Sequence, residues 1–305
     1  MMKEKYEKII GNFMVIISAA LWGITGVIAQ YLYDTSGISV GAVVIIKLMI
    51  TGSLLLLYCF YKYKKLTFQV WSNKKDAIRM LLLALLGITG TQYAYFSAIE
   101  TSDAPTATVL LYTYPVLVII VMAVKNRCRP SWKDGMCIMC AVVGTLVIAT
   151  HGKIAELAIS GEALFWGLAA SACNCYFSVF SAELTEKYGS VTVNGWGMFI
   201  GCVVVSMVDY GEMTSFHFSM EVVLCLGAIV ILGTMVSFVL YLRGIQIIGA
   251  VRASVLGAVE PLSALIVAVS FLNQKIVMAD IAGMFVIILS VLFPVIYREK
   301  MKDLL

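Results

Sequence analysis

Residues 87–115, GITGTQYAYFSAIETSDAPTATVLLYTYP, recur in outline as residues 233–261, GTMVSFVLYLRGIQIIGAVRASVLGAVEP. Landmark residues keep their spacing at a constant offset of 146 positions: Gly87 and Gly233, Tyr95 and Tyr241, Ile99 and Ile245, Ala104 and Ala250, Ala107 and Ala253, Pro115 and Pro261, and Asp134 and Asp280. This match at a single offset indicates that the chain contains two copies of one unit.

The composition indicates that much of the protein surface faces lipid. Hydrophobic residues make up 61% of the 305 residues and charged residues only 13%, whereas soluble domains are roughly half apolar and a quarter charged. A membrane-spanning helix needs about 20 apolar residues. Ten such stretches fill the chain, at 11–30, 39–61, 76–98, 104–124, 131–149, 161–182, 192–209, 220–242, 249–270 and 277–297.

The sequence therefore predicts an all-α integral membrane protein with ten transmembrane helices, arranged as two five-helix repeats at 11–149 and 161–297. Because five is an odd number, the second repeat must be inverted relative to the first. Inverted repeats with a substrate site between them, near the middle of the membrane, are typical of secondary transporters.

The basic residues predict the orientation of the chain. Of the 22 Lys and Arg residues, only Lys153 and Lys275 fall in the loops of one side, while Lys47 falls within a span and the others lie on the opposite side. The positive-inside rule makes that opposite side cytoplasmic. We therefore expect a multi-pass protein of the plasma membrane with both termini in the cytoplasm. The net charge of +4 then reflects anchors at lipid headgroups and not a nucleic-acid surface.

Two charged residues lie deep within expected spans. Glu260 is about 16 Å into the ninth span at the standard helical rise, where an ionised carboxylate costs at least about 2.5 kcal/mol. It is a candidate for proton coupling or for binding a cationic substrate group, and a structural pair or hydrogen bond is the alternative. Lys47 could pair with Glu260, bind an anionic substrate group, or extend its side chain outward along the helix.

A proline lies within the fourth span and another within the ninth. Pro115 and Pro261 lack an N–H, so the carbonyl groups four residues earlier, at Leu111 and Gly257, lose their helical partner. The matched positions favour a hinge or a polar backbone patch, to which Gly257 adds flexibility. A static kink is the alternative.

Further polar and aromatic residues lie within the spans, as expected for a cavity that binds a small amphipathic molecule. Each of them could instead serve only helix packing and interhelical hydrogen bonding. The candidate substrate-binding residues are Trp22, Thr25, Gln92, Tyr95, Tyr112, Tyr114, Asn174, Tyr176, Ser237 and Tyr241.

The sequence lacks the motifs of several other classes of protein. There is no phosphate-binding Gly-x4-Gly-Lys-Ser/Thr loop, so direct use of ATP is not expected. His151 and His217 fall in separate loops, and Cys137 and Cys140 lie on an apolar helix without a second ligand pair, so neither a metal site nor another cofactor is expected. No nucleophile elbow occurs, and the sequence does not predict an enzyme.

The chain resembles the EamA-type ten-helix transporters of the drug/metabolite transporter superfamily. The residues that carry the resemblance are Leu21-Trp22-Gly23, the run Tyr95-Phe96-Ser97-Ala98-Ile99, Ala104-Pro105-Thr106-Ala107 leading to Tyr114-Pro115, and the echo from Ala250 to Ala253 leading to Glu260-Pro261. Members often carry an arginine in the second span, where this chain has Lys47. The resemblance implies transport of amino acids, related compounds, nucleosides, drugs or other metabolites, often outward.

These observations favour a secondary active transporter that exports a small amphipathic metabolite by alternating access, with protons as a candidate coupling ion. A non-transporting receptor or scaffold and a passive channel are the alternatives, although no ring of like charges indicates a channel. The fifth and tenth spans are almost purely apolar, so we expect them at the periphery, as scaffold or as the contact of a homodimer.

Overall fold

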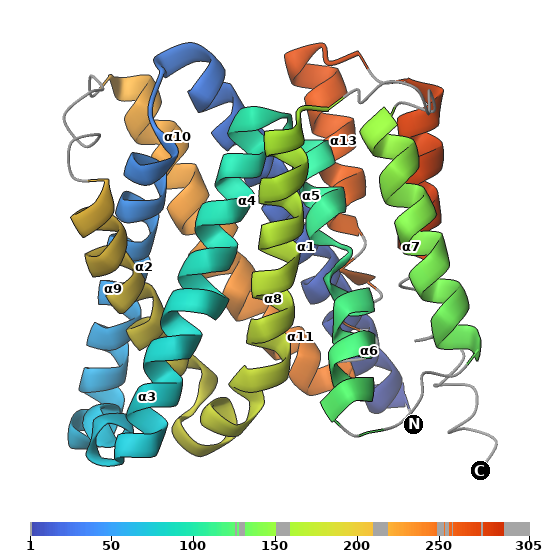
Figure 1. Cartoon of the computed structure of the whole chain (residues 1–305). Coiled ribbons are helices and arrows are strands. Elements are labelled where there is room, and N and C mark those ends of the chain that lie inside the picture. Colours follow the sequence, from blue (N-terminus) through green and yellow to red (C-terminus); the bar gives the residue numbers. More distant parts are fainter. Residues whose placement is uncertain are drawn as a thin grey trace.

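The computed structural model describes residues 2–125, 127, 132–150, 159–209, 219–248, 253, 256–257, 259–275 and 277–289. Ala250, Arg252, both histidines and the last part of the expected tenth span lie outside the described residues. Every element within the described ranges is a helix, and the helices form one bundle (Figure 1).

The first half of the chain contains spans one to five. Its elements are α1 (Met2–Ser36), α2 (Val40–Tyr63), the 3-10 helix η1 (Lys64–Ser72), α3 (Lys74–Leu82), the π-helical segment η2 (Leu83–Thr89), α4 (Gly90–Thr101), α5 (Ala104–Leu111), α6 (Tyr114–Lys125) and α7 (Trp132–Thr150).

The second half follows the same order. Its elements are α8 (Gly161–Tyr188), α9 (Ser190–Val208), α10 (Met220–Val230), the π-helical segment η4 (Ile231–Val236), α11 (Ser237–Ile248), α13 (Val259–Leu272) and a last apolar helix, Met278–Leu289.

Seven helical segments of the described chain are long and apolar enough to cross a membrane, and they cover the expected spans one to four and six to eight. The helix α7 and the shorter apolar helices Val259–Leu272 and Met278–Leu289 occupy the positions of spans five, nine and ten. The prediction of an all-α membrane protein is therefore confirmed.

Local sequence signals explain where many of the helices begin and end. Ser39, Asn73, Ser160 and Ser219 each accept a hydrogen bond from a backbone N–H in the first turn of the helix that follows, as expected for N-cap residues. The helices α1 and α8 are both followed by a glycine with positive φ, +62° at Gly37 and +81° at Gly189. Glycine adopts this conformation without a steric penalty.

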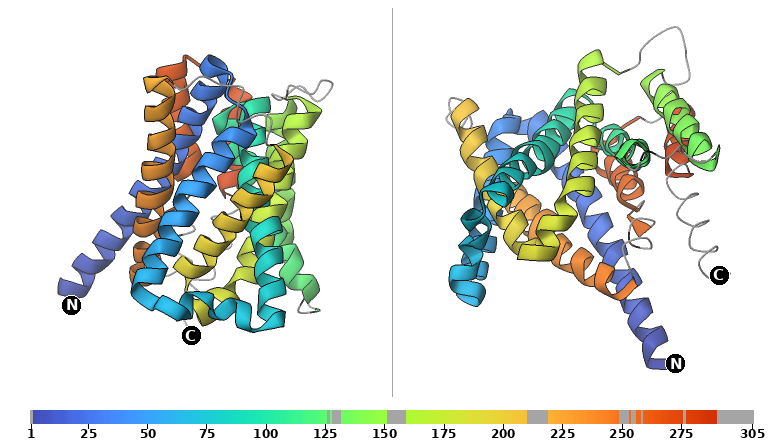
Figure 2. Two further views of the ribbon diagram at one scale, coloured as in Figure 1. Left: turned by 90° about the vertical axis from the view of Figure 1, so that its left-hand side faces the viewer. Right: turned by 60° about the horizontal axis from the view of Figure 1, so that its bottom comes forward.

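The two halves enter the bundle in opposite directions. The helix α1 begins at the end of the bundle marked N, whereas α8 begins at the opposite end and runs back toward it (Figure 1). Both views of Figure 2 show the start of α1 projecting beyond the other helices. The first helices of the two repeats are therefore antiparallel, as an inverted repeat requires.

The halves interlock through these first helices. The helix α1 packs along η4, α11 and α13 of the second half, and α8 packs along η2, α4, α5 and α6 of the first half. The second helices, α2 and α9, pack against each other. The first helix of each half is therefore covered by the third and fourth spans of the other half.

A π-helical segment occurs in the third span of both repeats, which the sequence analysis did not predict. Gly87 lies in η2 and Gly233 in η4. Around η4 the hydroxyl groups of Thr234 and Ser237 donate to carbonyl groups five residues earlier, at Ile229 and Leu232. Such wide turns are rare and often lie near functional sites.

The surface and the interior have the polarity of a membrane protein. Large apolar side chains are exposed along the outer helices, among them Met139 (63% exposed) and Leu146 (57%) on α7, whereas many threonines and serines are buried. The helix α7 lies beside the Met278–Leu289 helix at one edge of the molecule (Figure 2, right), and a Cβ added at Gly144 would lie 2.9 Å from the Gly283 carbonyl. Spans five and ten are therefore peripheral.

The close contact of α1 with α13 gives a stability test. A Cβ added at Gly23 would lie 2.1 Å from Ser263 Oγ and 2.4 Å from the carbonyl oxygen of Glu260, so Gly23→Ala must separate two helices that come from different repeats. Overpacking of this kind costs about 1–3 kcal/mol. At Gly227 a Cβ would meet nothing within 4 Å, so Gly227→Ala is the matched control. We expect Gly23→Ala to melt at a lower temperature than the parent protein in detergent and Gly227→Ala not to; equal melting temperatures for the two variants would contradict this packing.

Candidate functional site

Glu260 lies directly after an interruption of the ninth span. The helix α13 begins at Val259, and Glu260 is in its first turn and buried. Pro261 has no N–H to donate to the carbonyl group of Gly257. That carbonyl instead accepts the N–H of Glu260, at 2.9 Å, and the hydroxyl group of Tyr112.

The fourth span is interrupted at the corresponding place, so the continuous helix expected over 104–124 is in fact two helices. The helix α5 ends at Leu111 and α6 begins at Tyr114, with Tyr112 and Thr113 in a turn between them. The N–H groups of Tyr112 and Thr113 bond to the carbonyl groups of Thr108 and Leu110. In both spans the proline therefore lies in the first turn of the helix that follows a break. Whether the breaks act as hinges remains a prediction.

The two breaks meet inside the bundle. Tyr112, from the first break, donates its hydroxyl to Gly257, in the second, and the same hydroxyl lies 3.4 Å from Oε2 of Glu260. The two freed segments of backbone, which come from opposite repeats, are thereby joined through one side chain.

Glu260 is surrounded by tyrosines. Tyr95 on α4, Tyr112, Tyr114 on α6 and Tyr241 on α11 each interact electrostatically with it. The hydroxyl group of Tyr95 also bonds to Thr108 Oγ1 at 2.8 Å. The surroundings of the carboxyl group are therefore aromatic with a few hydroxyl groups, and both repeats contribute to them.

Lys47 lies nearby on α2. Its Nζ donates to Gln92 Oε1 at 2.7 Å and lies 4.7 Å from the centroid of the Phe96 ring. Lys47 and Glu260 are both described, and they interact electrostatically without forming a direct ion pair. Two opposite charges therefore face the same interior region, each with a neutral hydrogen-bonding partner.

Trp22 contributes an aromatic wall from α1. Its ring lies 5.0 Å from that of Tyr241 and 6.3 Å from that of Phe238, between ring centroids. Trp22 thus connects the first helix of the first repeat to α11 of the second. With Tyr241 it joins the group of aromatic residues near Glu260.

Other predicted site residues lie in helix contacts. Thr25 donates to the carbonyl groups of Leu21 and Trp22 on its own helix and lies against Gly233. Ser237 is fully buried, and its carbonyl accepts the hydroxyl of Ser18. These contacts favour a packing role for both residues, which their sequence positions did not distinguish from substrate binding.

Asn174 and Tyr176 lie on α8, away from the contacts of Glu260. The ring of Tyr176 packs against Phe180 at 4.6 Å and against a buried cluster that includes Met80 and Leu184. Asn174 accepts a hydrogen bond from Ser178 through its backbone carbonyl. Their role in substrate binding stays a prediction.

Three residues that contact this region were absent from the predicted set. Phe96 faces Lys47, Thr108 bonds to Tyr95, and Ser263 Oγ donates to the backbone carbonyl of Ala20 at 3.2 Å. Residues three or four positions apart lie on one face of a helix. This spacing relates Phe96 to Gln92, Thr108 to Tyr112 and Ser263 to Glu260, and could have identified all three.

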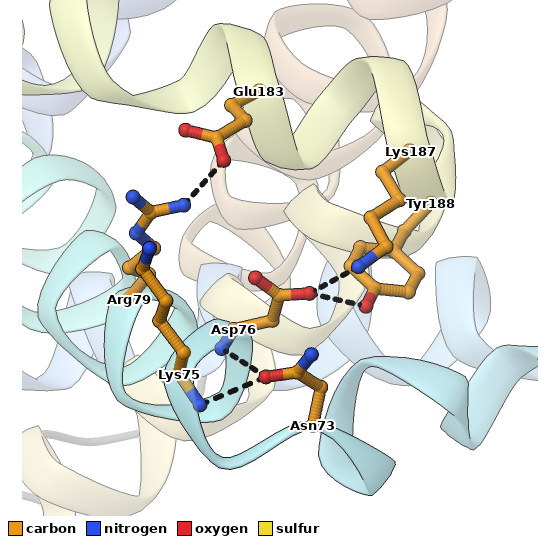
Figure 3. Close-up of polar contacts among 7 residues, drawn as sticks. All are labelled: Asn73, Lys75, Asp76, Arg79, Glu183, Lys187 and Tyr188. Carbon is orange, nitrogen blue, oxygen red and sulfur yellow. Dashed lines mark hydrogen bonds and ion pairs between the residues drawn. The ribbon is translucent and has the colours of Figure 1, made fainter.

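Polar contacts between the repeats also occur at both ends of the bundle. At the end where α1 begins, Oδ2 of Asp76 on α3 accepts from Lys187 Nζ at 2.5 Å and from the Tyr188 hydroxyl at 2.7 Å, and Arg79 pairs with Glu183 (Figure 3). Lys187, Tyr188 and Glu183 all lie on α8.

At the opposite end, Tyr31 of α1 donates to Glu221 of α10.

The bond between Lys47 and Gln92 gives a further test. Gln92→Leu leaves the ammonium group without its acceptor, and a hydrogen bond to a charged group contributes about 1.5–3 kcal/mol. Adding Lys47→Met removes the unpaired charge, so the double variant should be more stable than Gln92→Leu alone. Thermal denaturation of the parent, both single variants and the double variant measures this coupling. Losses that simply add would show that the two side chains act independently.

Comparison with known proteins agrees with this architecture. The sequence matches the model of the EamA-like transporter family twice, over residues 9–150 and 161–296. It is 33% identical over 282 residues to "Uncharacterized inner membrane transporter YicL" of Salmonella typhimurium, covering 92% of this chain and 94% of that protein. It is 26% identical over 198 residues to "Uncharacterized transporter YcbK" of Bacillus subtilis, covering 62% of each.

The fold also occurs in a solved crystal structure, with a TM-score of 0.64 and 15% sequence identity over 95% of this chain and 98% of the other. At that identity the likeness concerns the fold alone. The two family matches and the similarity to the Salmonella protein over nearly the whole chain lead to one conclusion. The chain belongs to the EamA-like transporter family, within the drug/metabolite transporter superfamily, and is a multi-pass membrane transporter.

Proposed function

We propose that this protein is a secondary active transporter that exports a small amphipathic metabolite, such as an amino acid, a related compound or a drug, by alternating access. The observation that carries the proposal is the meeting of both helix breaks beside Glu260, with Tyr112 bonded to Gly257 across the repeats. Interrupted helices that meet between inverted repeats are where secondary transporters bind substrates and coupling ions.

The side chains around this point suit an amphipathic substrate. Trp22 and the tyrosines near Glu260 offer aromatic faces, while Lys47 and Glu260 offer one charge of each sign. A largely apolar lining with few aimed polar groups is typical of small-molecule sites. Export, as opposed to uptake, rests on the family resemblance alone.

The polar contacts at the two ends support alternating access because they are related by the inverted repeat. Tyr31 precedes Gly37 by the same number of residues as Glu183 precedes Gly189. Tyr31 bonds to Glu221 in the first turn of α10, and Glu183 pairs with Arg79 in the last turn of α3. Since α3 and α10 both begin the third span of their repeat, the two contacts join corresponding helices at opposite ends of the bundle. We propose that they close the two entrances and open in turn.

The lysines assign a side of the membrane to each end. Lys62, Lys64, Lys65, Lys74 and Lys75 lie around η1 and the start of α3, at the end of the bundle where α1 begins (Figure 1). The positive-inside rule makes this the cytoplasmic end. The contacts of Asp76, Arg79 and α8 then form the inner closure in the plasma membrane, and Tyr31 with Glu221 the outer one.

Glu260 is proposed to couple transport to protons. It would bind a proton from one side and release it to the other as the substrate crosses in the opposite direction. Glu260→Gln keeps the shape of the side chain but holds it neutral. We expect this variant to lose stimulation of transport by a pH gradient while it retains exchange of substrate across the membrane without a gradient.

The compound to follow is the one whose extracellular level changes most when cells overproduce the protein. Its flux is then measured in proteoliposomes that contain the purified parent protein or Glu260→Gln, with and without an imposed pH gradient. Gradient-driven flux by Glu260→Gln at the parent level would remove Glu260 from the mechanism. Flux that needs no alternation, with both entrances accessible at once, would favour a channel. The absence of any flux would favour a receptor or scaffold.

The inner closure predicts a change in accessibility. Leu184 is 2% exposed and packs in a buried cluster with Met80, against which the ring of Tyr188 also packs. A Leu184→Cys reporter in a background without native cysteines should therefore react slowly with an impermeant maleimide. Asp76→Asn weakens the bonds to Lys187 and Tyr188, and we expect it to raise the labelling rate from the cytoplasmic side. Arg79→Gln should have a smaller effect, because Arg79 and Glu183 are 37% and 72% exposed and exposed pairs contribute little. Unchanged labelling in Asp76→Asn would contradict the proposed closure.

A further inference from the structure

Tyr112 connects the helix breaks of the two repeats. It lies in the turn between α5 and α6, and its ring is buried among Val109, Met284 and Ile287. Its hydroxyl group donates to the carbonyl of Gly257 and is 3.4 Å from Oε2 of Glu260. One side chain therefore reaches from the break in the first repeat to both the break and the carboxyl group of the second.

A tyrosine hydroxyl group has a single proton to donate. At Tyr112 that proton has two acceptors within reach, the carbonyl of Gly257 and the carboxyl group of Glu260. When Glu260 is protonated it is the weaker acceptor, and the bond to Gly257 is preferred. When Glu260 is ionised its bond becomes charge-assisted, and such bonds are roughly twice as strong as neutral ones.

The transfer of this bond changes the contact between the repeats. While Tyr112 bonds to Gly257, it ties the backbone of one helix break to the backbone of the other. When the bond moves to the carboxylate, the donor that Gly257 keeps among the described residues is the N–H of Glu260, three residues later in the same repeat. The backbone at the second break is then held by its own repeat alone.

Other groups also face Glu260. Lys47 on α2, Tyr95 on α4, Tyr114 on α6 and Tyr241 on α11 interact with it electrostatically. The helix α1 faces α13 at this level through Gly23, which carries no side chain. Among the described residues, Tyr112 is the one whose side chain bonds to Glu260 and also to the backbone of the break.

We propose that Tyr112 is a positioning residue that converts the protonation of Glu260 into a shift of its contact with the second repeat, from the backbone carbonyl of the helix break to the side-chain carboxylate. This inference rests on the proposed proton coupling. The proton that Glu260 binds comes from water on one side and returns to water on the other. Tyr112 keeps its own proton throughout and only redirects it from one oxygen to another.

Hydrogen–deuterium exchange of the purified full-length protein in detergent tests the inference with protons as the only ligand. The segments to follow are 113–121 and 259–267, with exchange at each pH corrected for the intrinsic rate. In the parent protein the bond from Tyr112 to the backbone of Gly257 should protect both segments at low pH, and this protection should fall as Glu260 ionises and the bond moves to its side chain. A hydrogen bond of ordinary strength corresponds to about a fivefold change in an equilibrium constant, so we expect protection to fall about fivefold.

Three variants separate the contributions. Tyr112→Phe keeps the ring and removes the hydroxyl, so protection should be low and independent of pH. Glu260→Gln cannot ionise, so protection should stay high at every pH, which tests the tie even if Tyr112→Phe does not fold. Tyr114→Phe is the matched control, because Tyr114 is also a tyrosine beside Glu260 but only packs edge-on against Tyr112, and it should behave like the parent protein.

The outcomes distinguish this inference from the proposed function. If Tyr112→Phe keeps the pH dependence of the parent protein while Glu260→Gln loses it, Glu260 senses protons and the role of Tyr112 is wrong. If Glu260→Gln keeps the pH dependence, another group senses protons and the proposed coupling itself fails. If Tyr114→Phe loses the dependence as well, the effect belongs to the aromatic surroundings and not to the hydroxyl group of Tyr112.

Discussion

Backbone groups inside a membrane must find hydrogen-bond partners within the protein, because the lipid offers none. Pro115 and Pro261 remove one donor each from the middle of a bundle, at matched positions in two inverted repeats. The carbonyl of Gly257 accepts the N–H of Glu260 and also the hydroxyl group of Tyr112, which comes from the other repeat. That requirement places the two interruptions together, and Glu260, one residue before Pro261, comes with them.

The packing of the first helices also joins the two halves. The first helix of each repeat packs on the third and fourth spans of the opposite repeat, and this packing links the two units. Small residues permit the approach, as at Gly23 against Ser263 and at Gly233 against Thr25. In the proposed mechanism, a movement at one helix break would be transmitted to a helix of the other repeat, whose far end carries a polar contact.

Much of the fold could be predicted from the sequence because apolar length, repeat spacing and charge asymmetry are properties of the chain itself. That Pro261 frees the carbonyl of Gly257 also followed from covalent structure, whereas the full break between α5 and α6 did not. The partners did not. That Lys47 bonds to Gln92, that Thr25 and Ser237 lie in helix contacts, and that Tyr176 lies away from Glu260 depend on how helices rotate about their axes. The π-helical segments at Gly87 and Gly233 likewise leave no clear pattern in the sequence.

Distances between spin labels at the two ends of the bundle test the central claim most directly. One pair of labels would join Ile78 on α3 to Ala182 on α8, and the other Asp34 on α1 to Met220 on α10, all at exposed positions. Measured by double electron–electron resonance in lipid nanodiscs over a range of pH, with and without substrate, one distance should lengthen in the same population in which the other stays short. Two distances that remain fixed, or that lengthen together, would contradict alternating access between inverted repeats.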